Sequence, residues 1–257
     1  MPYSKTSPKL FYTDTGKGKP VVLLHGFLGS SVCWDACVET LLETHRVLTF
    51  DCPAHGNSKP PQEGSSLKHY ASQIALTLHD LKLANVCVVG HSLGGYIALE
   101  LLRLIPEKIQ TFVLLNSTCM ADSSTKKLAR NRAANLLLKS PEMFVRMAYR
   151  NLISESRFEE LRPLISKRMA IAKTFPPKGL ITILEAMRDR PDYTKALQSY
   201  NGKKYWLQSY NDSFLDVNLA SKIAAQTHCN FKTFNGGHLC LIEQPNVVAS
   251  LLRNILA

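Results

Sequence analysis

The sequence of 257 residues predicts an α/β fold, a mostly parallel sheet covered by helices on both faces. Two patterns carry this prediction. Short apolar runs rich in β-branched residues alternate with longer stretches of helical periodicity. A serine also lies between two glycines where an apolar run gives way to a helical pattern, a junction that is typical of catalytic α/β domains.

The apolar runs give the expected strands in chain order. Residues 10–14 are predicted to form a first, antiparallel strand, and the turn after them is rich in glycine. The run 86–89 is apolar throughout, as expected of a strand that is buried on both faces. The other expected strands cover residues 21–24, 47–50, 111–115, 204–208 and 230–234. Helices are expected near 31–43, 67–82, 94–105, 217–225 and 245–256.

The pattern changes after residue 119. From about 120 to 191 no strand signal is present, whereas helical periodicity recurs. We therefore expect an α/β core made of residues 1–119 and 193–257, with residues 120–192 inserted as a helical cap, or lid.

Composition limits the class of protein. A hydrophobic content of 45% is enough for a full core, and no apolar run is long enough to cross a bilayer. Residues 1–9 lack the apolar stretch of a signal peptide. Seven cysteines, without a Cys-x-x-Cys pair, are expected to be reduced core residues rather than disulfides or metal ligands. These features predict a soluble, cytoplasmic protein with no membrane partner and no metal site.

The net charge of +11 is concentrated in the expected cap. That segment holds fifteen Lys and Arg residues against eight Asp and Glu residues, a net charge of +7. No Lys/Arg run with interleaved aromatic residues is present, so nucleic acid is not an expected partner. Two hypotheses remain for the charge: a solvated helical surface, or arginines that attract an anionic or carrier-bound substrate. The candidate arginines are Arg130, Arg132, Arg146, Arg150, Arg157 and Arg162.

The serine between two glycines is Ser92, in the sequence Gly90-His-Ser-Leu-Gly94. A strand-to-helix turn this tight forces the serine toward positive φ, and its neighbours two residues away must lack side chains. Ser92 is therefore the expected nucleophile. The same turn directs the N–H of Leu93 toward a developing oxyanion.

A serine nucleophile requires a base and a carboxylate that orients the base. His238 follows the last expected strand in Phe-Asn-Gly-Gly-His, where two glycines allow a sharp loop. Asp212 follows the strand before it and is the expected acid, and Asp216, one turn later, is the alternative.

A second glycine-rich loop, His25-Gly26-Phe27-Leu28-Gly29, follows another buried strand. Backbone N–H groups in such a loop suit a substrate oxygen, so Phe27 N–H is the expected second oxyanion donor. His25 and Gly26 in this loop, together with His91 beside the nucleophile, are expected to contact substrate.

The ordered set of the His25 loop, Asp51-Cys-Pro-Ala-His-Gly-Asn-Ser58, the Ser92 motif, Asp212 and Gly237-His238 resembles the α/β-hydrolase superfamily over essentially the whole chain. Within it, the chain is most similar to single-domain serine hydrolases with a helical cap: small esterases, acyl-carrier-protein methyl ester esterases and carbon–carbon bond hydrolases. The resemblance implies an eight-stranded sheet, a cap after the sixth strand and no cofactor.

Three details qualify the resemblance. Ala54 and Ser209 stand where the family usually has glycine, which affects loop geometry without touching catalytic atoms. Because the nucleophile is serine, the resemblance points away from epoxide hydrolases and haloalkane dehalogenases, which use aspartate at that position.

We therefore expect a serine hydrolase that cleaves a small-molecule acyl ester or thioester through an acyl-enzyme. Two alternatives remain. One is a carbon–carbon bond hydrolase or lyase that uses the same three residues, and the other is a ligand-binding protein on a hydrolase scaffold.

Overall fold

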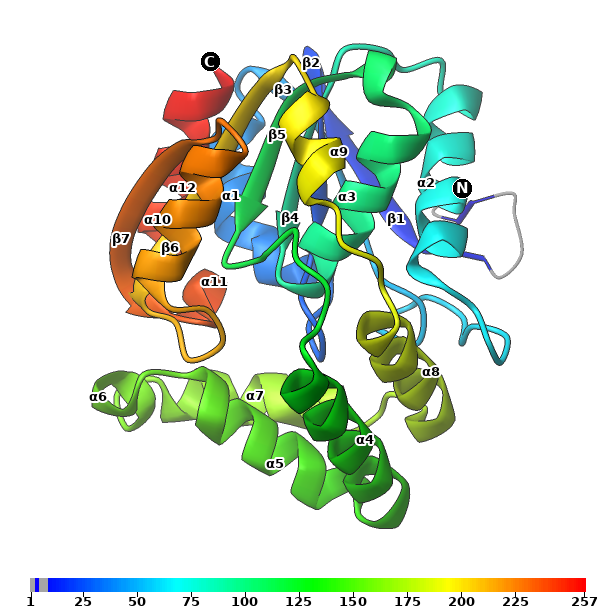
Figure 1. The fold of residues 1–257 in the computed structure, drawn as a ribbon, viewed down its shortest axis with the longest axis vertical. Helices are drawn as coiled ribbons and strands as arrows, with labels where there is room; N and C mark the ends of the chain where they lie inside the picture. Colours follow the sequence, from blue (N-terminus) through cyan, green and yellow to red (C-terminus); the bar gives the residue numbers. More distant parts are fainter. Residues whose placement is uncertain (1–2, 5–8) are drawn as a thin grey trace.

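The computed structural model describes residues 3–4 and 9–257, so the predictions on residues 1–2 and 5–8, which include most of the N-terminal stretch, lie outside it. The strands of the described chain form one sheet in the order β1-β3-β2-β4-β5-β6-β7 (Figure 1). β1 is antiparallel to β3, as predicted for the first strand, and every other pairing is parallel. The bounds are β1 Tyr12–Gly16, β2 Lys19–Leu24, β3 His45–Phe50, β4 Val86–His91, β5 Ile109–Leu115, β6 Lys203–Asn211 and β7 Asn230–Gly237.

The expected number of strands needs correction. The resemblance implied eight, whereas the sheet of the described residues has seven. Ahead of β1, the described chain makes only an isolated antiparallel bridge between Tyr3 and Phe11. The α/β class itself, with a mostly parallel sheet between helices, is confirmed.

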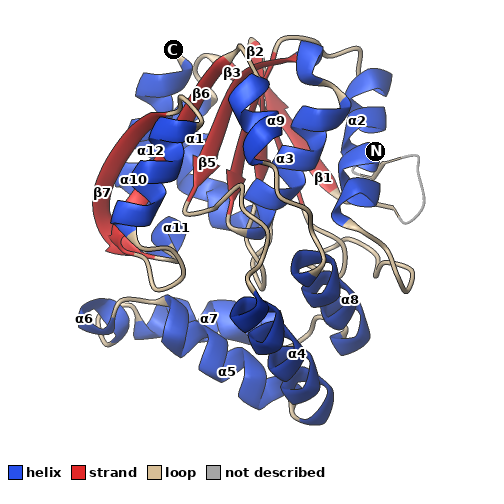
Figure 2. Ribbon diagram, viewed as in Figure 1, coloured by secondary structure: helices blue, strands red, loops and turns tan. Residues whose placement is uncertain are grey.

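Helices cover both faces of the sheet (Figure 2). One face carries α2, α3, α9 and α10, and the other carries α1, α11 and α12 (Figure 1). Their bounds are α1 Asp35–Leu41, α2 Leu67–Asp80, α3 Leu93–Leu104, α9 Thr194–Ser199, α10 Val217–Gln226, α11 Cys240–Glu243 and α12 Pro245–Leu256, with short 3-10 turns η1 Ser31–Trp34 and η2 Pro106–Lys108.

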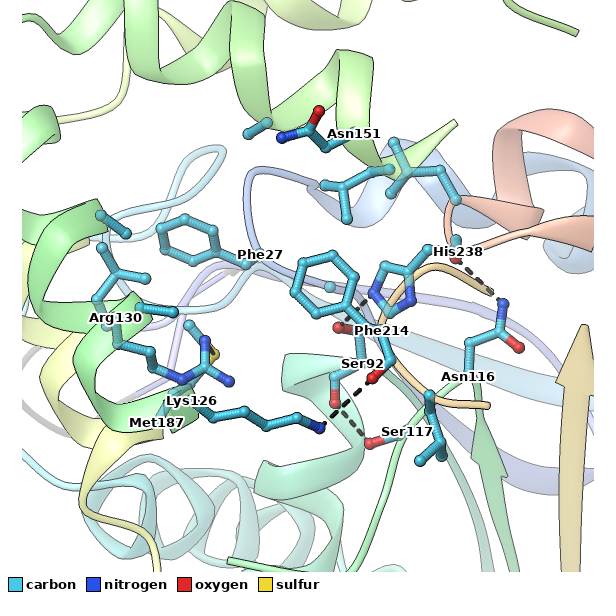
Figure 3. Close-up of a pocket in the computed structure, with 18 of the residues that line it drawn as sticks. Phe27, Ser92, Asn116, Ser117, Lys126, Arg130, Asn151, Met187, Phe214 and His238 are labelled. Carbon is cyan, nitrogen blue, oxygen red and sulfur yellow. Dashed lines mark hydrogen bonds between the residues drawn. The ribbon is translucent and has the colours of Figure 1, made fainter. Parts of the chain in front are cut away.

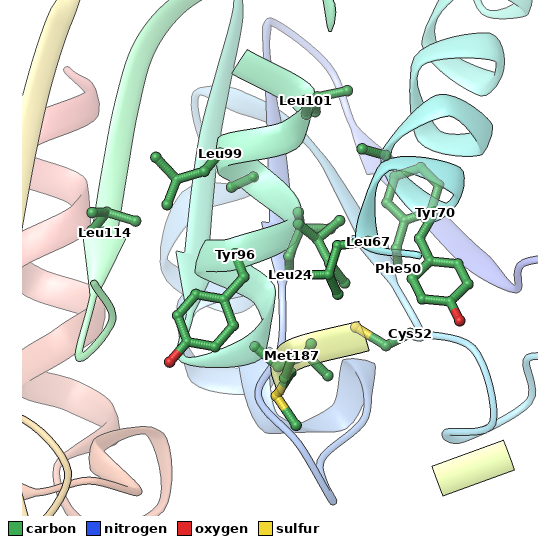
Figure 4. Close-up of a cluster of buried hydrophobic side chains, with 14 of the residues drawn as sticks. Leu24, Phe50, Cys52, Leu67, Tyr70, Tyr96, Leu99, Leu101, Leu114 and Met187 are labelled. Carbon is green, nitrogen blue, oxygen red and sulfur yellow. The ribbon is translucent and has the colours of Figure 1, made fainter. Parts of the chain in front are cut away.

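The central strands explain why two cores form. Successive side chains of a strand point to opposite faces, so Val22 and Leu24 pack on the α2/α3 side while Val21 and Leu23 pack on the α1/α12 side. All four side chains are fully buried. The larger cluster, shown in Figure 4, also contains Met187 from the far end of the helical segment.

Five helices lie between β5 and α9: α4 Ser124–Lys139, α5 Pro141–Leu152, α6 Glu155–Phe158, α7 Arg162–Ala172 and α8 Pro177–Arg188. They gather beyond the carboxyl ends of the parallel strands (Figure 1). Residues 120–192 contain no strand, as predicted; we call them the helical insertion. Across the described part of the chain, each helix is too short or too polar to span a bilayer.

Candidate active site

Ser92 lies in the turn between β4 and α3. Its backbone has φ +51° and ψ −115°, the positive φ that the sequence predicts for a nucleophile elbow. The neighbouring glycines have a steric reason to lack side chains. A Cβ on Gly90 would collide with the backbone of Gly94 and Gly95, and one on Gly94 would collide with the backbone oxygen of Leu24.

Ser92, His238 and Asp212 are joined by hydrogen bonds. His238 Nε2 lies 2.9 Å from Ser92 Oγ, and His238 Nδ1 lies 2.9 Å from Asp212 Oδ1. The three residues follow β4, β7 and β6, whose carboxyl ends meet at one edge of the sheet. The structure thus brings together the three residues that the sequence singled out from motifs far apart in the chain.

The carboxylate of Asp212 is held as an anion. Its side chain is fully buried, and burial by itself raises the pKa of a carboxyl. The attraction of His238 and the hydrogen bonds to the carboxylate outweigh burial, so the pKa of Asp212 is lowered. The donors besides His238 are Phe214 N at 2.8 Å, Gln208 Nε2 at 3.0 Å and Leu215 N at 3.4 Å.

Asp216, the alternative acid, lies elsewhere. Its carboxylate accepts hydrogen bonds from Asn218 N and Leu219 N, both at 3.0 Å, and caps the start of α10. The structure therefore brings Asp212, and not Asp216, to His238.

The loop after β2 lies against the nucleophile. A Cβ on Gly26 would lie 3.3 Å from Ser92 Cβ and 2.7 Å from His91 Nδ1, so the loop passes directly beside the elbow. Within the described chain, the N–H groups of Phe27 and Leu93 have no hydrogen-bond acceptor. Two unpartnered amides beside a serine suit an oxyanion.

Two buried histidines shape this loop rather than the pocket. His25 Nδ1 donates to Gly26 O at 2.7 Å, and its Nε2 accepts from Cys52 N at 2.8 Å. His55 Nε2 accepts from Leu28 N at 3.0 Å. Burial lowers the pKa of His25, and it lowers the pKa of His55 to about 3. The expectation that His25 contacts substrate is therefore corrected: both of its ring nitrogens are bonded behind the loop.

His238 is also held through its backbone. His91 Nε2 donates to His238 O at 2.9 Å, and Asn116 Nδ2 donates to the same oxygen at 3.2 Å. Asn116 further bonds Ser209 Oγ at 2.8 Å, and Ser209 Oγ donates to Gly237 O at 2.8 Å. Burial, with the nearby His238, lowers the pKa of His91 to about 3, so its ring is a neutral donor. Asn116 stands in no motif that could have singled it out from the sequence.

A cavity of about 380 Å³ opens onto Ser92 and His238 (Figure 3). Gly26 and His91 border it, and most of its wall comes from the helical insertion. Phe214 packs against the His238 ring at 4.8 Å between centroids. Most of the wall is apolar: Phe27, Tyr96, Leu136, Phe144, Met147, Ala148, Leu152, Leu184, Met187, Phe214, Leu215 and Leu239.

Comparisons with known proteins agree with this fold. Residues 19–151 match the family described as alpha/beta hydrolase fold. An esterase from Thermogutta terrifontis has a TM-score of 0.91 at 26% identity, covering 98% of this chain and 96% of that one. An enol-lactonase from Burkholderia xenovorans has the same TM-score at 16% identity, covering 99% of both chains, which shows likeness of fold alone.

Curated relatives match over shorter stretches. A pimeloyl-acyl-carrier-protein methyl ester esterase from Nitrosomonas europaea is 36% identical over 104 residues, 40% of this chain and 39% of that protein. The chain spans about half or less of the length of the first curated relatives it matches.

The fold and the serine elbow are of the kind found in hydrolases. More particularly, the chain belongs to the α/β-hydrolase fold family.

Proposed function

We propose that this protein hydrolyses a carboxylic ester or thioester through an acyl-enzyme on Ser92. The observation that carries the proposal is the hydrogen-bonded series of side chains from Asp212 through His238 to Ser92. Ser92 and His238 border a largely apolar cavity. The esterases among the similar proteins support the same class of reaction.

In the proposed mechanism, His238 Nε2 accepts the proton of Ser92 Oγ as that oxygen attacks the acyl carbon. The N–H groups of Phe27 and Leu93 stabilise the oxyanion of the tetrahedral intermediate. His238 then returns the proton to the departing alcohol or thiol. Water, deprotonated by His238, attacks the acyl-enzyme, and collapse releases the acid and restores Ser92.

Asp212 fixes the direction of this proton transfer. An ionised carboxylate that accepts from Nδ1 keeps the other nitrogen, Nε2, unprotonated and facing Ser92. It also stabilises the imidazolium that forms when His238 takes the proton. No cofactor is required by these steps.

The same proposal includes the role of residues 120–192 and the location of the protein in the cell. Residues 120–192 serve as a cap, because they supply most of the cavity wall over Ser92. We place the protein in the cytoplasm, a proposal supported by its seven cysteines, all of which are free.

Hydrolysis of p-nitrophenyl butyrate tests the proposal. Ser92→Ala and His238→Ala should each reduce turnover by about 10⁶, because loss of either partner removes nearly the whole chemical advantage. Ser72→Ala, at a half-buried position on α2 that does not border the cavity, should retain wild-type turnover. Circular dichroism should show all variants folded.

Two results would reject the proposal. Turnover in Ser92→Ala within tenfold of wild type would remove Ser92 from the reaction. A folded wild-type protein that releases no burst of p-nitrophenol would instead favour a binding protein or a carbon–carbon bond hydrolase.

A further inference from the structure

The charged residues that border the cavity are all cationic. Lys126, Arg130 and Arg132 line it, and among the described residues neither aspartate nor glutamate does so. The rest of the wall is mainly apolar, so these side chains, with His238, dominate the electrostatics of the cavity. This asymmetry favours a substrate that carries negative charge.

Arg130 is already held in an ion pair. Its Nε donates to Asp122 Oδ2 at 2.5 Å, and Asp122 Oδ1 pairs with Arg190 at 2.8 Å. Both ends of this pairing are largely buried, so Arg130 is a structural cation. Arg132 borders the cavity from an exposed position on α4.

Lys126 is different. Its Nζ donates to the backbone oxygen of Phe214 at 3.4 Å, and no carboxylate lies within ion-pair distance of it in the described structure. Phe214 in turn packs against His238. The ammonium group is therefore held by a residue that touches the base, with Lys126 reaching across the cavity from α4 (Figure 3).

The position of Lys126 in its helix does not explain its presence. It is the third residue of α4, in the first turn after the Ser123 cap, and that turn has no acidic residue. A cation there opposes the helix dipole. The charge is thus placed where it weakens the helix and faces the cavity.

We propose that the substrate carries a carboxylate, which Lys126 Nζ pairs with when the ester lies at Ser92. This inference rests on the proposed function and names its substrate class. A single ammonium beside aliphatic walls fits an aliphatic chain that bears one carboxylate, on either the acyl or the alcohol side of the ester.

Matched ester pairs test the preference. Monomethyl adipate is compared with methyl hexanoate for a carboxylate on the acyl side, and hexanoyl glycolate is compared with ethyl hexanoate for the alcohol side. Wild type should have the higher kcat/KM for the charged member of at least one pair. Lys126→Met should lower that charged-to-neutral ratio by about tenfold or more, because a charge-assisted hydrogen bond is lost.

Two further variants isolate the charge of Lys126. Lys127→Met removes the same charge from the neighbouring, exposed position of α4, which does not border the cavity, and should keep the wild-type ratio. Lys126→Arg keeps the charge and should retain most of the preference. An unchanged ratio in Lys126→Met, or an equal fall in Lys127→Met, would overturn the inference.

A binding measurement tests this inference independently of the proposed hydrolysis. Monomethyl adipate and hexanoyl glycolate, titrated calorimetrically into Ser92→Ala, report recognition without turnover. The ester that wild type prefers should bind about tenfold more weakly when Lys126→Met is added. If wild type hydrolyses neither pair, the comparison uses the charged ester that binds Ser92→Ala more tightly. Weaker binding of that ester to the Ser92→Ala, Lys126→Met double variant still supports the inference. Hydrolysis of the neutral esters with no charge preference, and no binding of either charged ester, would overturn it.

Discussion

Asp212 and Asp216 lie four residues apart and make different hydrogen bonds. Asp212 accepts from His238 through a fully buried side chain, whereas Asp216 accepts from two backbone amides at the start of α10. The first arrangement orients an imidazole, and the second caps a helix.

Substitution separates these roles. Asp212→Asn should lower kcat for an ester by about 10⁴, because an amide that donates to His238 holds it in the wrong tautomer. Asp216→Asn should leave kcat and stability nearly unchanged, since asparagine caps a helix about as well as aspartate. Steady-state kinetics on both variants checks this, and the reverse ranking would assign the acid to Asp216.

The residues of the site differ in how far the sequence could predict them. Ser92 and His238 stand in local motifs whose glycines and strand context are visible in the sequence. Asn116, Lys126 and Phe214 have no such motif. Their roles arise only when β5, α4 and the loop after β6 meet, so they required the structure.

The two departures from the family's glycines have opposite consequences. Ala54 adopts φ +64°, a conformation that costs a residue with a Cβ roughly 1–2 kcal/mol. Ser209 is fully buried and uses its hydroxyl to join Asn116 to Gly237 O. The serine side chain thus adds a bond behind His238 that a glycine there would lack.

At the scale of elements, the strands and helices follow the sequence closely because their apolar periodicity is local. The expected helix 245–256 has the observed bounds of α12, and the expected strand 86–89 lies within β4. The expected helix 31–43 was less accurate, since its first turn is the 3-10 helix η1. How the helical insertion joins the core was not predictable, because that junction depends on long-range ion pairs.

One buried cluster joins the two ends of the insertion. Asp122, near its start, pairs with Arg130 and with Arg190 near its end. Arg190 also donates to Met187 O at 2.6 Å and to Met120 O at 2.8 Å, and its guanidinium lies 3.9 Å from the centre of the Tyr96 ring on α3. The cluster therefore fixes the insertion to the core at the point where the chain leaves and returns.

Asp122→Asn should destabilise the protein by about 3–5 kcal/mol, because it leaves two largely buried guanidinium groups without their counter-ion. Glu159→Gln is the comparison. Glu159 pairs with Arg162 on the exposed surface, so its loss should change the free energy of unfolding by less than roughly 1 kcal/mol. Urea unfolding measures both, and equal stability of the two variants would show that the cluster does not hold the insertion.

On the scale of the whole molecule, positive charge is concentrated on the side that holds the cavity. Several arginines of the insertion pair with glutamates on the surface, among them Arg150, Arg157 and Arg162. These pairs leave the segment's net charge of +7 unchanged. A field of this kind acts over distance and is screened by salt, whereas the contact at Lys126 is local.

Salt should therefore affect charged and neutral esters differently. Between about 0.01 M and 1 M NaCl the Debye length falls from about 30 Å to about 3 Å. Over that range kcat/KM for monomethyl adipate should fall, because fewer anions are drawn to the cavity, while kcat/KM for methyl hexanoate should stay nearly constant. Lys126→Met should lower the value for the charged ester at every salt concentration yet keep part of its salt dependence, since the rest of the insertion stays positive. Equal salt dependence for the two esters would show that the charge of the insertion has no part in substrate capture.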